Sequence, residues 1–245
     1  MPRIFIQPEL ITDDAVTLPE AEAKRLARVL RMKPGDSVTL FDGAREYDTA
    51  IESISTKSVT LRIVSTTVLQ DPVRLKLTLG QGVPKGEKLE WVVQKAVELG
   101  VSTVMPVLME RSIRRPGREG AARGNSRLRR IATEAAQQSG RVSVPEVPGY
   151  MDLREFLEAT KDADVKVVFY EGAKSEGLRA LLRSAGPAGS VALLVGPEGG
   201  LTQAEVDEAV EAGYAVAGLG PRILRTETAA VAALAIVQYE LGDVG

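Results

Sequence analysis

Charged side chains lie in two glycine-bearing loops near the end of the 245-residue chain. The first loop, residues 196–200, reads GPEGG and carries Glu198. The second loop, residues 218–225, reads GLGPRILR and carries Arg222 and Arg225. Glycines in such loops often serve only to make tight turns, but turns need no charged residues. A carboxylate is able to accept a proton and a guanidinium to stabilise a negative charge, so the two loops together indicate a site for a bound ligand.

Two strand–loop–helix units are predicted to position these loops, because each loop follows a short apolar run with the length of a buried strand. Thr202 and Glu205 have the spacing of a capping box that starts a helix. Thr226 or Thr228 is expected to cap a second, alanine-rich helix. Two such units place both loops at one edge of a parallel sheet, where α/β folds bind ligands. The sequence therefore predicts a small molecule held largely by backbone groups.

The residue types that are missing restrict the chemistry. The chain contains no cysteine and no histidine, which excludes disulfides, Cys/His zinc sites, thiol nucleophiles and Ser-His-Asp triads. Runs of acidic residues with calcium-loop spacing are missing too, and we expect no metal site. Group transfer in which positioning dominates is the expected type of reaction.

Composition and hydropathy are typical of a globular protein with one large domain or two. The formal net charge is −2 and 44% of the residues are hydrophobic. No apolar run approaches the roughly 20 residues of a membrane span, and the first residues lack the apolar region of a signal peptide. We expect no membrane association and a cytoplasmic location.

Residues 1–71 are predicted to form a small β-rich domain with one early helix. The helix is expected over 19–30, with Leu26, Val29 and Leu30 on its apolar side. Short β-type runs at 37–41, 46–54 and 58–65 suggest a small barrel. Its basic residues form either a solvated face or an RNA-binding patch. They are Arg3, Lys24, Arg25, Arg28, Arg31 and Lys33.

Residues 72–245 alternate between strand and helix patterns, which predicts a parallel sheet covered on both faces. Strands are expected at 74–79, 103–108, 165–170 and before each of the two loops, and helices at 88–99, 126–139 and 175–185. The run GQGVPKG at 80–86 has GxGxxxG rather than GxGxxG spacing, and no GxxxxGK[ST] occurs. A nicotinamide or P-loop enzyme is therefore disfavoured, and this run is interpreted as a loop carrying Lys85 and Lys88.

Arginine is concentrated between residues 111 and 130, where eight arginines accompany the single acid Glu119. Proline and glycine interrupt this segment, which suggests a flexible loop entering a helix. Such charge runs are usually solvated surface, but the guanidinium matches phosphate oxygens with two parallel hydrogen bonds. The segregation of arginine in an acidic protein favours RNA or another polyanion as a partner.

Several motifs carry a resemblance to a known family. The most specific are GPEGG at 196–200 and LGPRILRTETA at 219–229. Further motifs are RIF at 3–5, VLR at 29–31, KAVELGV at 95–101 and EAAQQSGR at 134–141. In these motifs the chain resembles the RsmE family, the 16S ribosomal RNA uridine-N3 methyltransferases of the SPOUT superfamily. The family often has a histidine before the VLR run, which is missing here.

This resemblance implies a PUA-like RNA-binding barrel over 1–71 and a SPOUT methyltransferase domain over 72–245 whose end forms a trefoil knot. It also implies S-adenosylmethionine as methyl donor, a homodimer, and the 16S rRNA of the small ribosomal subunit as substrate. The donor's methionine end is expected at the first loop and its adenine at the second. The implied cofactor-binding residues are Glu171, Gly196, Pro197, Glu198, Gly199, Gly200, Leu219, Gly220, Ile223, Leu224 and Thr226.

The expected reaction requires uridine N3 to lose a proton, and nearby positive charge favours the resulting anion. Arg225 is the first candidate for that catalytic role. Glu198 and Glu227 are candidate bases, although each is also able to buttress a loop or a helix. Arg222 is expected to hold a phosphate or the uracil carbonyls. The candidate RNA-binding residues are Arg3, Arg25, Arg28, Arg31, Arg111, Arg114, Arg115 and Arg222.

Two other functions compete with this interpretation. A non-catalytic RNA-binding protein explains the arginines but not the two ligand loops. A SPOUT methyltransferase that acts on a different RNA explains both. Binding of S-adenosylmethionine separates the first alternative from a methyltransferase, and the identity of the methylated RNA separates the second.

Overall fold

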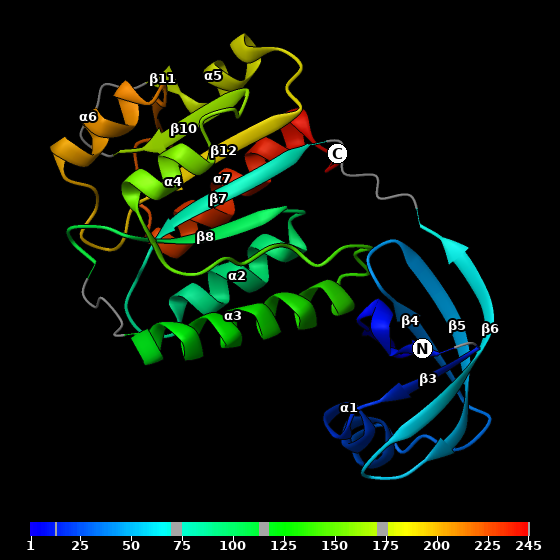
Figure 1. The fold of residues 1–245 in the computed structure, drawn as a ribbon. Coiled ribbons are helices and arrows are strands. Elements are labelled where there is room, and N and C mark those ends of the chain that lie inside the picture. Colours follow the sequence, from blue (N-terminus) through cyan, green and yellow to red (C-terminus); the bar gives the residue numbers. More distant parts are fainter. Residues whose placement is uncertain (13, 70–74, 113–117, 171–175, 245) are drawn as a thin grey trace. The chain divides into compact units, whose positions relative to one another are not determined.

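A computed structural model describes residues 1–12, 14–69, 75–112, 118–170 and 176–244 (Figure 1). The chain divides into two compact units. The first comprises Met1–Pro72 and Ala136–Val144, and the second comprises Val73–Ala135 and Pro145–Gly245. The sequence interpretation placed 136–144 in the second domain, whereas these residues make their contacts within the first unit.

The first unit contains one six-stranded sheet in the order β1-β4-β5-β6-β3-β2. The strands β1 and β4 are parallel and all other pairs are antiparallel. Alternate residues of β4 and β6, such as Val38, Leu40, Val59 and Leu61, are fully buried and form its core. The strands are β1 (Arg3–Phe5), β2 (Ile11–Thr12), β3 (Ala15–Leu18), β4 (Ser37–Phe41), β5 (Arg45–Ile54) and β6 (Val59–Val68).

The early helix of the first unit differs from the prediction in its second half. It begins as α1 (Glu20–Lys24) and continues as a π-helical segment (Arg25–Val29). Leu26 is fully buried, but the side chain of Val29 is 74% exposed. The wider π turn changes the direction in which successive side chains point, so the predicted apolar side is wrong beyond Leu26. Arg31 lies two residues beyond the end of this segment, and its φ of 54° is the only positive value at a non-glycine among the described residues.

The second unit contains a seven-stranded parallel sheet in the order β11-β13-β10-β12-β7-β8-β9 (Figure 1). The strands are β7 (Lys76–Gly82), β8 (Thr103–Leu108), β9 (Met151–Asp152), β10 (Val165–Phe169), β11 (Glu176–Gly177), β12 (Ser190–Val195) and β13 (Ala215–Gly218). The central strand β12 is buried along residues 191–195, as expected for a sheet covered on both faces.

Helices cover both faces of this sheet. Side chains of α4 and α6 pack with Ala192 and Leu194 of β12 on one face. The helices α2 and α7 pack together on the other face. The helices are α2 (Lys88–Glu98), α3 (Arg118–Gln138), α4 (Leu153–Ala159), α5 (Leu178–Ala185), α6 (Gln203–Glu211) and α7 (Thr226–Leu241). Every helix in the described residues is too short or too polar to cross a membrane.

The arginine-rich segment is more helical than predicted. The helix α3 begins at Arg118 rather than near residue 126, so Gly120 and Gly124 lie inside it. A Cβ atom at Gly124 would lie 2.9 Å from the hydroxyl oxygen of Tyr150. Close tertiary packing therefore explains a glycine that the sequence interpretation took as a helix breaker.

Gly80 allows the aromatic ring of α4 to pack directly on β7. A Cβ atom at Gly80 would lie 2.5 Å from the fully buried ring of Phe156. We therefore expect Gly80→Ala to lower the free energy of unfolding by about 1–3 kcal/mol, as for other overpacked cores. Urea denaturation measures this change. Gly149→Ala is the matched control, because open space surrounds that position; equal stability of both variants would contradict the prediction.

Candidate active site

The two predicted loops lie at the carboxyl edge of the parallel sheet. The first loop (Gly196–Gly200) follows β12, and the second loop (Gly218–Arg225) leads from the end of β13 into α7. The strand β10 lies between β12 and β13, so the two loops start about 10 Å apart, which is twice the spacing of neighbouring strands. That distance suits an extended small molecule that contacts both loops.

The first loop lies directly against the end of β7. A Cβ atom at Gly82 would lie 2.6 Å from the backbone nitrogen of Pro197 and 2.8 Å from the carbonyl carbon of Gly196. Any side chain at position 82 would push this backbone away. The glycine therefore fixes how closely the first loop approaches the sheet edge.

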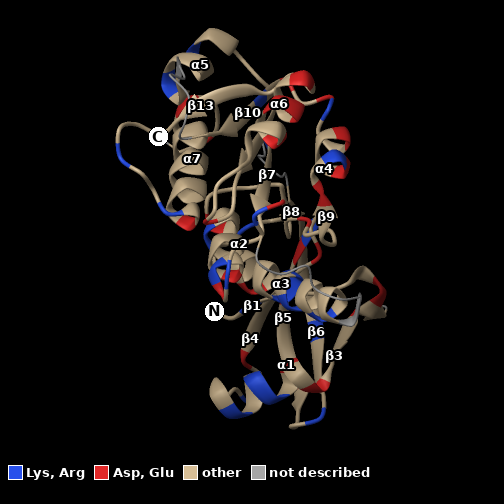
Figure 2. Ribbon diagram, turned by 90° about the vertical axis from the view of Figure 1, so that its left-hand side faces the viewer, with Lys and Arg blue, Asp and Glu red and all other residues tan. Residues whose placement is uncertain are grey.

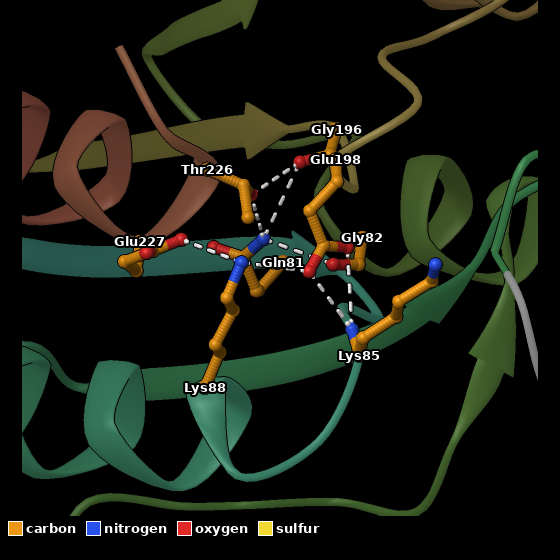
Figure 3. Close-up of polar contacts among 8 residues, drawn as sticks. All are labelled: Gln81, Gly82, Lys85, Lys88, Gly196, Glu198, Thr226 and Glu227. Carbon is orange, nitrogen blue, oxygen red and sulfur yellow. Dashed lines mark hydrogen bonds and ion pairs between the residues drawn. The ribbon is translucent and has the colours of Figure 1, made fainter.

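A buried polar network joins the first loop to the start of α7 (Figure 3). Nε2 of Gln81 donates to the Thr226 hydroxyl at 2.9 Å and to the Gly82 carbonyl at 2.9 Å. The Thr226 hydroxyl in turn donates to the Gly196 carbonyl at 2.5 Å. Gln81 is fully buried and Thr226 is 7% exposed, so these bonds are shielded from water and rigid. Thr226 is the first residue of α7 rather than its cap, and Arg225 occupies the cap position.

Glu198 is held at both carboxylate oxygens. The backbone N–H of Lys85 donates to Oε1 at 3.1 Å and to Oε2 at 3.2 Å, and Nζ of Lys88 donates to Oε1 at 2.9 Å (Figure 3). The Lys88 ammonium also lies 3.5 Å from Oε2 of Glu227. These contacts indicate that Glu198 supports the first loop structurally rather than acting as a free base.

The same bonds set the ionisation of Glu198. Partial burial by itself would raise the pKa, but the bonds from Lys88 and from the backbone N–H groups of Glu198 and Lys85 outweigh it. The pKa of Glu198 therefore lies below its ordinary value of 4.5. The pKa of Lys88 is raised, chiefly by its hydrogen bond to Glu198.

Arg111 also holds the first loop in place. Its Nη1 donates to the carbonyl oxygen of Gly199 at 2.9 Å. The start of the following helix is fixed by Glu205, which forms the predicted capping box with Thr202 and also accepts from the backbone N–H of Glu110 at 2.8 Å. The sequence interpretation assigned Arg111 to RNA, but in the structure its guanidinium holds a loop carbonyl.

A pocket of about 530 Å³ opens beside the second loop, within the usual size range for small-molecule sites. The second loop contributes the stretch Gly218–Gly220 to its wall, which includes the predicted residues Leu219 and Gly220. The side chains on its other walls come from α5 and α7, and the sequence interpretation did not include them. They are Leu178, Arg179, Ala235, Ile236, Tyr239 and Glu240.

The rest of the second loop is open to solvent. Ile223 is 81% exposed, Leu224 is half-buried, and Arg222 and Arg225 are exposed. Within the described residues, Arg225 forms no ion pair or side-chain hydrogen bond. Its charge is therefore available to a ligand. Glu171, also predicted at this site, lies outside the described residues.

The predicted RNA-binding arginines of the first unit differ in their environment. Arg3 lies 3.7 Å from the centroid of the Phe41 ring, pairs with Glu46 at 3.0 Å and donates to the Arg141 carbonyl at 2.6 Å. It is therefore engaged within the unit. Arg28 and Arg31 are exposed, and Arg25 pairs weakly with Glu22 at 3.7 Å. Figure 2 shows lysine and arginine positions along α1 and α3; Arg114 and Arg115 lie outside the described residues.

Sequence reasoning interpreted the GQGVPKG segment as a loop carrying Lys85 and Lys88, but it missed the roles of Gln81, Gly82 and Lys88 at the site. Gln81 and Gly82 lie at the end of β7, and Lys88 begins α2. The segment was recognised as glycine-rich, but its partners are more than 100 residues away, in the first loop and α7. Among the described residues, no group of three or more potential ligands is placed to hold a metal ion.

The lowered pKa of Glu198 predicts a pH-dependent contribution to stability. Because the folded-state pKa is depressed, this contribution is present above about pH 4.5 and is lost as the pH falls through the folded-state value. We expect Glu198→Gln to lower Tm at pH 7, and the difference from the wild-type Tm to shrink as the pH falls below 4.5 and through the folded-state pKa. Thermal unfolding across this range measures the effect. In a Lys88→Met background the same substitution should change Tm much less; an unchanged effect would contradict the role of Lys88.

Both parts of the chain match known protein families. A model of the RNA methyltransferase domain matches residues 71–238, and a model of the RNA methyltransferase PUA domain matches residues 18–64. Ribosomal RNA small subunit methyltransferase E of Bacillus subtilis is 36% identical over 225 residues, which cover 89% of this chain and 88% of the relative. The corresponding protein of Synechocystis is 32% identical and covers 95% and 76% of the two chains.

Solved structures agree with these relatives. The ribosomal RNA small subunit methyltransferase E of Neisseria gonorrhoeae, bound to S-adenosyl methionine, superimposes with a TM-score of 0.89 at 34% identity over 100% of both chains. A Legionella pneumophila protein in complex with the cofactor SAM gives a TM-score of 0.91 at 33% identity over 99% of both chains. On these grounds the chain, an α/β parallel-sheet domain joined to a PUA domain, belongs to the ribosomal RNA small subunit methyltransferase E family.

Proposed function

We propose that the protein transfers the methyl group of S-adenosylmethionine to N3 of one uridine in the 16S rRNA of the small ribosomal subunit. Membership of the family makes it an S-adenosylmethionine-dependent ribosomal RNA methyltransferase. The observation that carries the proposal is the pair of loops at the carboxyl edge of the sheet, which Gln81 and Thr226 tie together.

The geometry of both loops fits the methyl donor. The first loop offers backbone groups for the donor's methionine end, and its position is fixed by Gly82 and Arg111. The second loop offers Leu219, Gly220, Ile223 and Leu224 for the adenine, next to the pocket of about 530 Å³. When bound, S-adenosylmethionine supplies a methyl group that its sulfonium already activates. No metal is needed for this chemistry.

The chain's own residues then have to orient uridine N3 and favour the loss of its proton. Arg225 is exposed, stands directly before α7 and has no ion-pair partner in the described residues. Its positive charge favours the N3 anion that attacks the methyl group. Glu227 is the candidate base, although its contact with Lys88 also suits a structural role. Arg222 is left to hold a phosphate or the uracil carbonyls.

The first unit is assigned to RNA binding. Its PUA match and the exposed side chains of Arg28 and Arg31 support this assignment. Arg28 lies in the π-helical segment and Arg31 follows it in a left-handed conformation, beside the exposed Val29. Phosphate contacts from these arginines would position the RNA rather than read its sequence.

The proposal extends to the trefoil knot, a homodimer and a cytoplasmic location. The knot is supported by the resemblance of the two C-terminal loop motifs to the family, and the hydrogen bonds of Thr226 bring the start of α7 against the first loop. The homodimer is supported by large apolar side chains exposed on or near α7, such as Tyr239 at 66% and Ile223 at 81%. A ribosomal substrate supports the cytoplasmic location.

Methyl transfer to small ribosomal subunits that lack the modification tests the function. With labelled S-adenosylmethionine, we expect one methyl group per subunit and N3-methyluridine as the product nucleoside by mass spectrometry. Donor binding without transfer to these subunits would support a methyltransferase that acts on a different RNA. No donor binding at all would contradict the proposal.

Arg225→Ala tests the catalytic assignment. Removing a charge that stabilises the transition state should lower kcat about a hundredfold, while the Kd for S-adenosylmethionine should change less than about twofold. Single-turnover kinetics and calorimetry measure the two quantities. Arg154→Ala, which removes an exposed arginine of α4, is the control and should change neither. Equal losses in turnover and donor affinity would rule out the assignment.

A further inference from the structure

One lysine of α2 joins two segments that carry site residues. Nζ of Lys88 lies 2.9 Å from Oε1 of Glu198 in the first loop and 3.5 Å from Oε2 of Glu227 in the first turn of α7 (Figure 3). Glu227 stands two residues after Arg225. A single ammonium group therefore contacts the segment assigned to the methyl donor and the segment assigned to catalysis.

The partial burial of these groups strengthens the two contacts. The side chains of Lys88, Glu198 and Glu227 are 37%, 27% and 16% exposed, so water screens their charges less than at an open surface. Within the described residues, Oε2 of Glu227 has no hydrogen bond. The charge of Lys88 is then what offsets the burial of this oxygen.

Loss of Lys88 should not detach the two segments from each other. Gln81 and Thr226 already tie their inner ends, at Gly196 and at the first residue of α7. Lys88 acts further out, at Glu198 and Glu227. Its removal should therefore loosen the outer part of the first loop and the first turn of α7 while the fold is kept.

We propose that Lys88 is a positioning residue with two separable effects. Its contact with Glu198 sets the first loop for donor binding. Its contact with Glu227 sets the first turn of α7, and through it Arg225, for methyl transfer. This inference rests on the proposed function and assigns Glu227 a structural role beside the reacting groups.

The first experiment compares Lys88→Met, Lys88→Arg and Lys95→Met. Lys88→Met should raise the Kd for S-adenosylmethionine about fivefold and lower kcat about fivefold, near the upper limit for a partly exposed ion pair. Lys88→Arg keeps the charge and should restore both values to within about twofold. Lys95→Met is the matched control, because Lys95 pairs with Glu98 inside α2 at 2.8 Å, and both values should stay unchanged.

The second experiment separates the two contacts by double-mutant cycles. Glu198→Gln should reproduce the loss of donor affinity and Glu227→Gln the loss of kcat. Adding Lys88→Met should then leave the donor Kd of Glu198→Gln and the kcat of Glu227→Gln unchanged. Donor affinity is measured by calorimetry without RNA, so it does not depend on turnover.

Three results would overturn the inference. Additive losses in the cycles would show that Lys88 does not act through the two carboxylates. A kcat for Glu227→Gln far below that of Lys88→Met would make Glu227 a base in its own right. Wild-type values in Lys88→Met would remove the role of Lys88. If the wild-type protein binds no S-adenosylmethionine, the proposed function fails and the inference fails with it, whereas donor binding with wild-type values in Lys88→Met overturns the inference alone.

Discussion

The close contact between the first loop and the end of β7 is the constraint on which the site depends. Gly82 has no side chain, so the backbone at Gly196 and Pro197 lies against the sheet edge. That approach brings the Gly196 carbonyl within reach of Gln81 and Thr226. Buried hydrogen bonds of this kind are costly to leave unmade, which ties the position of the first loop to the start of α7.

Charged groups then hold the outer part of the first loop. Glu198 accepts from Lys85 and Lys88, and Arg111 donates to the Gly199 carbonyl. These contacts come from three segments: the connection after β7, the start of α2 and the residues after β8. A loop held in this way is preorganised. Ligand binding then costs less free energy than it would with a mobile loop, because the loop is already ordered.

A protein without histidine and cysteine has few groups that titrate near neutral pH. Methyl transfer from an activated sulfonium makes little demand for such groups, because positioning and electrostatic stabilisation supply most of the rate. This agrees with a site whose charged residues mostly hold backbone in place. Arg222 and Arg225 differ from these residues, since neither guanidinium has a hydrogen-bond or ion-pair partner among the described residues.

The sequence by itself determined the local elements and the two loops. Periodicity located five of the seven parallel-sheet strands but neither of the two-residue strands β9 and β11, which are too short to show a pattern. The spacing of Thr202 and Glu205 predicted a capping box that the structure contains. Only the tertiary structure decided the partners across the chain. In the tertiary structure β10 lies between β12 and β13, and Gln81 is buried against Thr226. Arg111 and Arg3 donate hydrogen bonds to backbone carbonyl groups within their own units. Such pairings join residues that are far apart in sequence. Propensity and periodicity describe only residues that are close in sequence, so they do not predict these pairings.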